Sequence, residues 1–150
     1  RISYMVLPQH LLKNYQNFCG FYSTTVSKIQ QEVLREFIRG GYFGRHLNKM
    51  RGIYKNKHDF LVSELKKRPW VENIAGDNAG LHVLVQVDTQ MSEEELCERA
   101  AEQGIHLMGI SEHYIHKLPV SKPVILLGYG KPDEKKILEG LNQLEQIILK

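Results

Sequence analysis

The stretch Gly41-Tyr-Phe-Gly-Arg-His-Leu-Asn-Lys-Met-Arg-Gly-Ile-Tyr54 combines an apolar stripe with a row of cations. Leu47, Met50 and Tyr54 fall at positions i, i+3 and i+7, which predicts one apolar face of a helix. Three cations lie largely off that face: Arg45, Lys49 and Arg51. A basic helix of this kind faces water, a phosphate group or an acidic protein surface.

Working outward from this stretch, we predict that its helix runs from about Phe43 through Lys67 and is closed by Pro69. A second helix is predicted after Ser27, with an apolar face, and Gly40-Gly41 ends it. The N-terminal part reads as a strand followed by a helix: Ile2–Leu7 and Leu11–Phe21.

After residue 80 the pattern changes to alternating β-rich segments and amphipathic helices. Ser92-Glu-Glu-Glu95 matches a capping box at the start of a helix that ends at Gly104. The predicted order is strand, helix, strand, loop, strand, helix: Gly80–Asp88, Ser92–Gln103, Ile105–Met108, Gly109–Lys122, Val124–Tyr129 and a last helix opened by Pro132. This order predicts an α+β layered fold, a small and largely antiparallel sheet covered by helices.

Composition places the chain among folded single domains: 150 residues, 42% hydrophobic and 25% charged. No apolar run approaches the roughly 18 residues of a membrane helix, so we expect no membrane partner. Two cysteines predict a reduced, cytoplasmic protein.

The charge is unevenly distributed along the chain. From Arg35 to Arg68, ten Lys and Arg residues outweigh three acids, which gives +7, so the rest of the +3 chain sums to −4. Such a segment can meet a polyanion, or acids elsewhere in a larger body.

Several segments resemble a known family. GGYFGRHLNKMRGIYKNKHDFL, which begins at Gly40, is similar to the pyridoxal-phosphate enzymes of aminotransferase fold type I. It most resembles the MocR/GabR-type regulators of the GntR family, which fuse a winged-helix DNA-binding head to an aminotransferase-like body. Three further segments fit in order: Arg1–Pro8, Ala79-Gly-Leu-His82 and Val124–Gly130.

The resemblance implies that residues 1–150 form the C-terminal small domain of a longer protein. The large domain of the same chain and any DNA-binding head would lie outside it. The implied function is a cytoplasmic, homodimeric transcription regulator that binds pyridoxal 5'-phosphate. It would contact DNA only through the absent head. The alternative is the small domain of a true aminotransferase, which moves an amino group between an amino acid and a 2-oxo acid. A third interpretation, a nucleic-acid-binding module, lacks aromatic stacking platforms and a glycine-rich phosphate loop.

The resemblance also assigns site residues. The family's Schiff-base lysine precedes residue 1, so the isolated chain is predicted to be catalytically inert. Arg1 stands where the family's arginine binds the cofactor phosphate. The arginine that grips a substrate carboxylate is expected in Met108-Gly-Ile-Ser-Glu112, where Glu112 would repel a carboxylate. This departure favours a regulator over an aminotransferase. His113 and His116 are alternative donors, and we expect no metal site.

Overall fold

The computed structural model of the chain describes residues 2–23, 26–76, 80–115 and 122–149. It divides into two compact units, Arg1–Asn48 and Lys49–Lys150. The long basic helix α3, Tyr42–Leu65, begins in the first unit and ends in the second.

The first unit contains helices α1, Gln9–Cys19, and α2, Lys28–Arg39, and the start of α3. The helix predicted after Ser27 is confirmed, and its start is a capping box: the Gln30 N–H donates to the Ser27 hydroxyl and the Ser27 N–H donates to the Gln30 side chain. Gly41 has a φ of 72°, a left-handed conformation that glycine adopts without strain. This glycine makes the predicted stop between α2 and α3.

The prediction of a strand at Ile2–Leu7 is wrong for this structure. Residues 2–7 form no strand, and the strands in the described part of the chain all lie beyond Arg68. A strand needs a neighbouring strand to satisfy its backbone groups. No described residue pairs with this segment, so its β-rich composition is not sufficient.

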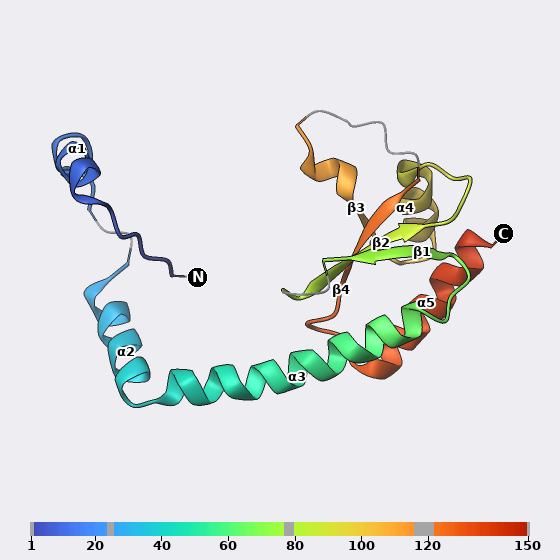
Figure 1. Ribbon diagram of the computed structural model, residues 1–150, viewed down its shortest axis with the longest axis horizontal. Coiled ribbons are helices and arrows are strands. Elements are labelled where there is room, and N and C mark those ends of the chain that lie inside the picture. Colours follow the sequence, from blue (N-terminus) through green and yellow to red (C-terminus); the bar gives the residue numbers. More distant parts are fainter. Residues whose placement is uncertain (1, 24–25, 77–79, 116–121, 150) are drawn as a thin grey trace. The chain divides into compact units, whose positions relative to one another are not determined.

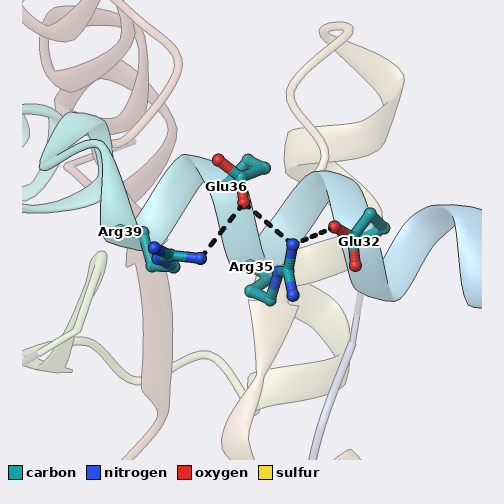
Figure 2. Close-up of polar contacts among 4 residues, drawn as sticks. All are labelled: Glu32, Arg35, Glu36 and Arg39. Carbon is teal, nitrogen blue, oxygen red and sulfur yellow. Dashed lines mark hydrogen bonds and ion pairs between the residues drawn. The ribbon is translucent and has the colours of Figure 1, made fainter.

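The apolar face of α2 is largely uncovered: none of its residues is buried, and only Phe37 is recorded in ring contacts, with Tyr42 and Phe43, in the described part of the chain. Ile29, Val33 and Phe37 follow each other at four-residue spacing and are 77%, 65% and 38% exposed. The helix also carries a chain of ion pairs, in which Arg35 lies between Glu32 and Glu36, and Arg39 reaches Glu36 at 3.8 Å (Figure 2). These charges are more than half exposed, so they stabilise α2 only slightly.

The second unit contains one four-stranded sheet, in the order β1-β2-β4-β3, with every neighbouring pair antiparallel (Figure 1). The strands are β1, Val71–Ala75; β2, His82–Val87; β3, Met108–Gly109; and β4, Val124–Gly128. The predicted α+β fold with a small antiparallel sheet is therefore confirmed. The edge strand β1 was not predicted, because Val71-Glu-Asn-Ile-Ala75 lacks regular alternation.

The core of this unit lies between the sheet and three helices: the end of α3, α4 at Glu93–Glu102, and α5 at Glu134–Ile148. Val83, Val85 and Val87 of β2 are buried, whereas the alternate residues are partly exposed. The sheet therefore packs one face on the helices. Trp70, immediately before β1, is 1% exposed and is among the largest side chains of the core.

Element ends differ from the predictions in three places. Ser92 caps α4 by accepting the Glu95 N–H at 3.1 Å, but the Glu95 carboxylate binds Arg99 instead of closing the predicted box. Asp133, not Pro132, caps α5. In place of the strand predicted at Ile105–Met108, the structure has the two-residue strand β3, Met108–Gly109. The loop predicted after it contains a 3₁₀ helix, η1, at Ile110–His113.

Candidate functional site

Glu112 lies on η1, immediately after β3, and is exposed. It borders a hollow of about 280 Å³ between η1 and α4. The lining is acidic: Glu93, Glu94, Cys97, Glu98, Gly109, Ser111 and Glu112. We call this feature the acidic hollow.

The carboxylate of Glu93 accepts hydrogen bonds from two backbone N–H groups and one hydroxyl around this hollow. Its Oε1 accepts the Ser111 N–H at 2.9 Å and also the Ser111 hydroxyl, and its Oε2 accepts the Val124 N–H at 3.3 Å. These bonds tie the first turn of α4 to η1 and to the start of β4. A Cβ at Gly109 would collide with the Glu93 carboxylate, so a larger residue there would push this side chain from its hydrogen bonds. Glu93 therefore has a structural role.

The Cys97 thiol lies in the same hollow, and its pKa is raised above the ordinary thiol value. Burial is the largest cause, and the charges of Glu93 and Glu112 add to it, while a hydrogen bond with the Gly109 backbone acts in the opposite direction. Because the thiolate is the nucleophile, a raised pKa makes Cys97 less reactive at neutral pH.

The acidic hollow does not fit a substrate carboxylate or the phosphate of pyridoxal phosphate. Its lining contains no lysine, arginine or histidine among the described residues. Negative charge repels an anion at close range, and phosphate sites in proteins use cationic or N–H donors. The assignment of Glu112 to the substrate position stays a prediction, and no step of a reaction follows from this hollow.

The other predicted site residues lie apart or outside the described residues. His113 is exposed, with its Nε2 3.2 Å from the Met108 sulfur. Arg1 and His116 fall outside the described residues. Among the residues that the structure describes, no three His, Cys, Asp or Glu side chains gather in a way that would hold a metal ion.

Several cations of the basic segment, Arg35–Arg68, contact other groups of the same chain. Lys57 donates to the Gly130 carbonyl at 3.1 Å, and Arg68, which follows α3, binds Glu145 and Asn142 of α5. Arg45 lies 4.7 Å over the Tyr42 ring. Lys57 and Arg68 therefore tie the end of α3 and the residue after it to the C-terminal part of the chain. Within the described ranges, no helix is long and apolar enough to span a membrane.

The sequence did not reveal Glu93 as the centre of this region. It appeared only as one of three glutamates that follow Ser92. Its partners, Ser111 and Val124, are 18 and 31 residues away. Only the folded sheet brings them together, so no local pattern would have identified it.

Comparison with known proteins gives consistent results. The family model for "Aminotransferase class I and II" matches residues 1–121. The chain is 37% identical over 147 residues to the uncharacterized HTH-type transcriptional regulator YdeL of Bacillus subtilis, a match that covers 97% of this chain and 31% of that protein. It is 27% identical to the probable rhizopine catabolism regulatory protein MocR of Rhizobium meliloti, across 99% of this chain and 30% of that protein.

A solved structure shows the same fold. LysN, an α-aminoadipate aminotransferase from Thermus thermophilus, superposes with a TM-score of 0.75 at 21% identity, over 95% of this chain and 36% of that one. The chain spans about a third of the length of the curated relatives it matches. With a family model that covers most of its length and a matching fold, this chain belongs to the aminotransferase class I and II family.

Proposed function

We propose that this chain acts as the C-terminal part of a pyridoxal-phosphate-binding, aminotransferase-like transcription regulator of the GntR/MocR type. The observation that carries the proposal is the similarity to the HTH-type transcriptional regulator YdeL along 97% of the chain and to the regulatory protein MocR along 99% of it. In this proposal, residues 1–150 pack as one small domain over the cofactor cleft of a larger cytoplasmic homodimer. DNA is bound by a separate N-terminal head.

The uncovered apolar side chains of the first unit support a partner within the same protein. In α2 and the start of α3, large apolar side chains are at least 38% exposed: Ile29, Val33, Phe37, Ile38, Tyr42, Phe43 and Leu47. Contiguous apolar surface of more than a few hundred Å² marks an interaction site. We propose that the large domain covers this surface in the intact protein, and that self-association covers it in the isolated chain.

Light scattering across a concentration series tests this part of the proposal. The 150-residue chain is expected to self-associate, because its exposed apolar faces otherwise stay in water. A strictly monomeric mass at high micromolar concentration contradicts it.

The cofactor proposal rests on the family, in which pyridoxal phosphate supplies an electron sink when bound. We propose that Arg1 contributes to its phosphate site in the intact protein and that the isolated chain is inert. The test is absorbance in the internal-aldimine region after the chain is mixed with pyridoxal phosphate, followed by borohydride reduction. No stable band is expected. A band that borohydride fixes to one lysine of this chain contradicts the proposal.

The second candidate function is the small domain of a true aminotransferase. The specific observation in its favour is the superposition on LysN across 95% of the chain. The sequence encoded upstream of Arg1 distinguishes the two candidates: a winged helix before the aminotransferase-like body supports the regulator, and a short arm supports the enzyme.

In a gel-shift titration, the chain alone is expected to bind DNA no more tightly than ~10⁻⁶ M, the tight end of non-specific binding.

A further inference from the structure

A second cavity, of about 200 Å³, lies in the second unit where the sheet edge meets α5. It arises because β3 pairs with β4 over only two residues, Met108↔Leu126 and Gly109↔Ile125. The preceding segment, Ile105–Leu107, is not part of the ladder and leaves space beside Leu127 and Gly128. In Figure 1 the chain passes from β4 through a short turn into α5. We call this space the edge cavity.

The floor of the edge cavity is apolar and firmly built. Leu61 of α3 and the α5 residues Ile137, Leu141 and Leu144 are 7% exposed or less. They come from two helices that belong to the main core. An apolar cavity of about 150 Å³ is sufficient to bind benzene, so this one has room for a phenyl ring or a branched alkyl group.

The one charged side chain on the lining, Lys136, favours an anion. His106 and Lys136 are exposed, and the lining contains no acid. Among the described residues, Lys136 forms no ion pair, whereas its neighbour Lys135 lies 3.8 Å from Glu139. Gly128 lies beyond the last β3–β4 pair and has no ladder partner on that side in the described part. Its backbone groups therefore add a neutral polar contact.

Gly140 borders the cavity from α5. A Cβ built at this position meets no atom within 4 Å, so the helix faces open space there. Glycine weakens a helix interior relative to alanine, yet its absence of a side chain keeps this part of the cavity open. A methyl group at position 140 would therefore meet no wall atom, and a longer side chain there is the means of filling the cavity.

From these features we infer that the edge cavity is a binding site for a small apolar carboxylate, with its hydrocarbon group against the leucines and its carboxylate beside Lys136 and His106. This site is distinct from the acidic hollow, which lies across β3 on α4 and has the opposite charge. It is a site for a small-molecule ligand on the C-terminal helix. It does not depend on the proposed regulatory function.

The test uses 3-phenylpropionate as the probe and the 150-residue chain as the protein, with ligand-observed saturation-transfer NMR, which tolerates self-association. For a ligand of this size we expect saturable binding with a dissociation constant on the order of 1 mM. The neutral 3-phenylpropan-1-ol is expected to bind several-fold more weakly, and the cationic 3-phenylpropylamine more weakly still.

Matched variants assign the site. Lys136→Gln is expected to weaken 3-phenylpropionate binding roughly threefold to tenfold by removing the charged partner, and Lys135→Gln to leave it unchanged. Gly140→Leu is expected to weaken binding at least tenfold by filling the cavity, with Gly140→Ala intermediate. Gly52→Leu, in open space on α3, is the control. Absence of saturable binding overturns the inference. So does equal binding of the amine, or binding that neither Lys136→Gln nor the Gly140 variants change.

Discussion

Helices α2 and α5 carry the same kind of apolar stripe, but the stripe is buried in α5 and exposed in α2. In α5, Ile137 and Leu141 are 7% and 3% exposed, whereas in α2, Ile29 and Val33 are 77% and 65% exposed. The difference lies in their neighbours, because α5 packs on a sheet and on α4, whereas α2 meets the start of α3 through the rings of Phe37, Tyr42 and Phe43 and buries none of its residues. An apolar stripe therefore predicts which face of a helix is favourable to bury. It does not predict whether another segment of the chain packs against that face.

The largest expected effect comes from separating the two regions. A chain of residues 42–150 keeps α3, the sheet and the whole buried core, and is expected to unfold cooperatively on heating. A chain of residues 1–41 contains no buried residue in its described part and is expected to show no cooperative transition. Circular dichroism during thermal unfolding measures both. A cooperative transition in residues 1–41 would mean that this region supplies its own core.

Substitutions on the two stripes sharpen the comparison. Leu141→Ala is expected to lower the free energy of unfolding by about 2–5 kcal/mol, because it leaves a cavity in the core. In a chain diluted until light scattering shows a monomer, Ile29→Ala is expected to change it by less than about 0.5 kcal/mol, because the side chain is then in water. Urea unfolding of the two variants at that dilution measures the difference. A cost of about 2 kcal/mol or more for Ile29→Ala in the monomer would show that the chain itself covers α2.

Gly109 tests the packing of Glu93 against the turn. Gly109→Ala is expected to lower the free energy of unfolding by about 1–3 kcal/mol, because its Cβ would collide with the Glu93 carboxylate. Gly52→Ala is the matched control, since it adds a methyl group to a helix in open space and should stabilise by up to about 1 kcal/mol. If Gly109→Ala were as stable as the parent, Glu93 would not be a structural tie.

Cys97 gives a smaller, pH-dependent effect. Its pKa is raised in the folded state by burial and by Glu93 and Glu112, so the folded chain holds the proton more tightly than the unfolded chain. Stability from this group is therefore complete below the unfolded thiol pKa of about 8.5. It is lost as the pH rises from there through the higher folded pKa.

The measurement is the pH profile of iodoacetamide alkylation in a Cys19→Ser background. We expect the midpoint for Cys97 to lie above that of the urea-unfolded chain, and Glu112→Gln to lower it by removing one negative charge. An unchanged midpoint in Glu112→Gln would contradict the proposed contribution of that charge.

The smallest expected effect concerns the α2 ion pairs of Figure 2. Glu36→Gln removes the contacts with Arg35 and Arg39, and is expected to change the free energy of unfolding by less than about 0.5 kcal/mol, because these groups are more than half exposed. Urea unfolding at low and high salt checks this. A cost above about 1 kcal/mol that salt removes would mean that the pairs act together as a network.

The sequence by itself determined most of the elements in this protein. Local signals were sufficient for the capping box at Ser27, the turn at Gly41 and the helix that follows Ser92, because capping and left-handed glycine depend on neighbouring residues alone. The alternation along β2 likewise predicted a sheet with one buried face. The resemblance of the basic helix and three further segments to known sequences predicted the family.

The tertiary structure decided what depends on contacts between distant segments. Ile2–Leu7 forms no strand because no described segment pairs with it, whereas Val71–Ala75 forms one because β2 lies beside it. Glu93 binds groups 18 and 31 residues away, and the edge cavity exists because β3 stops pairing after two residues. Pairing partners and cavities are properties of the assembled chain, since local sequence fixes neither which strand lies alongside nor where a ladder ends.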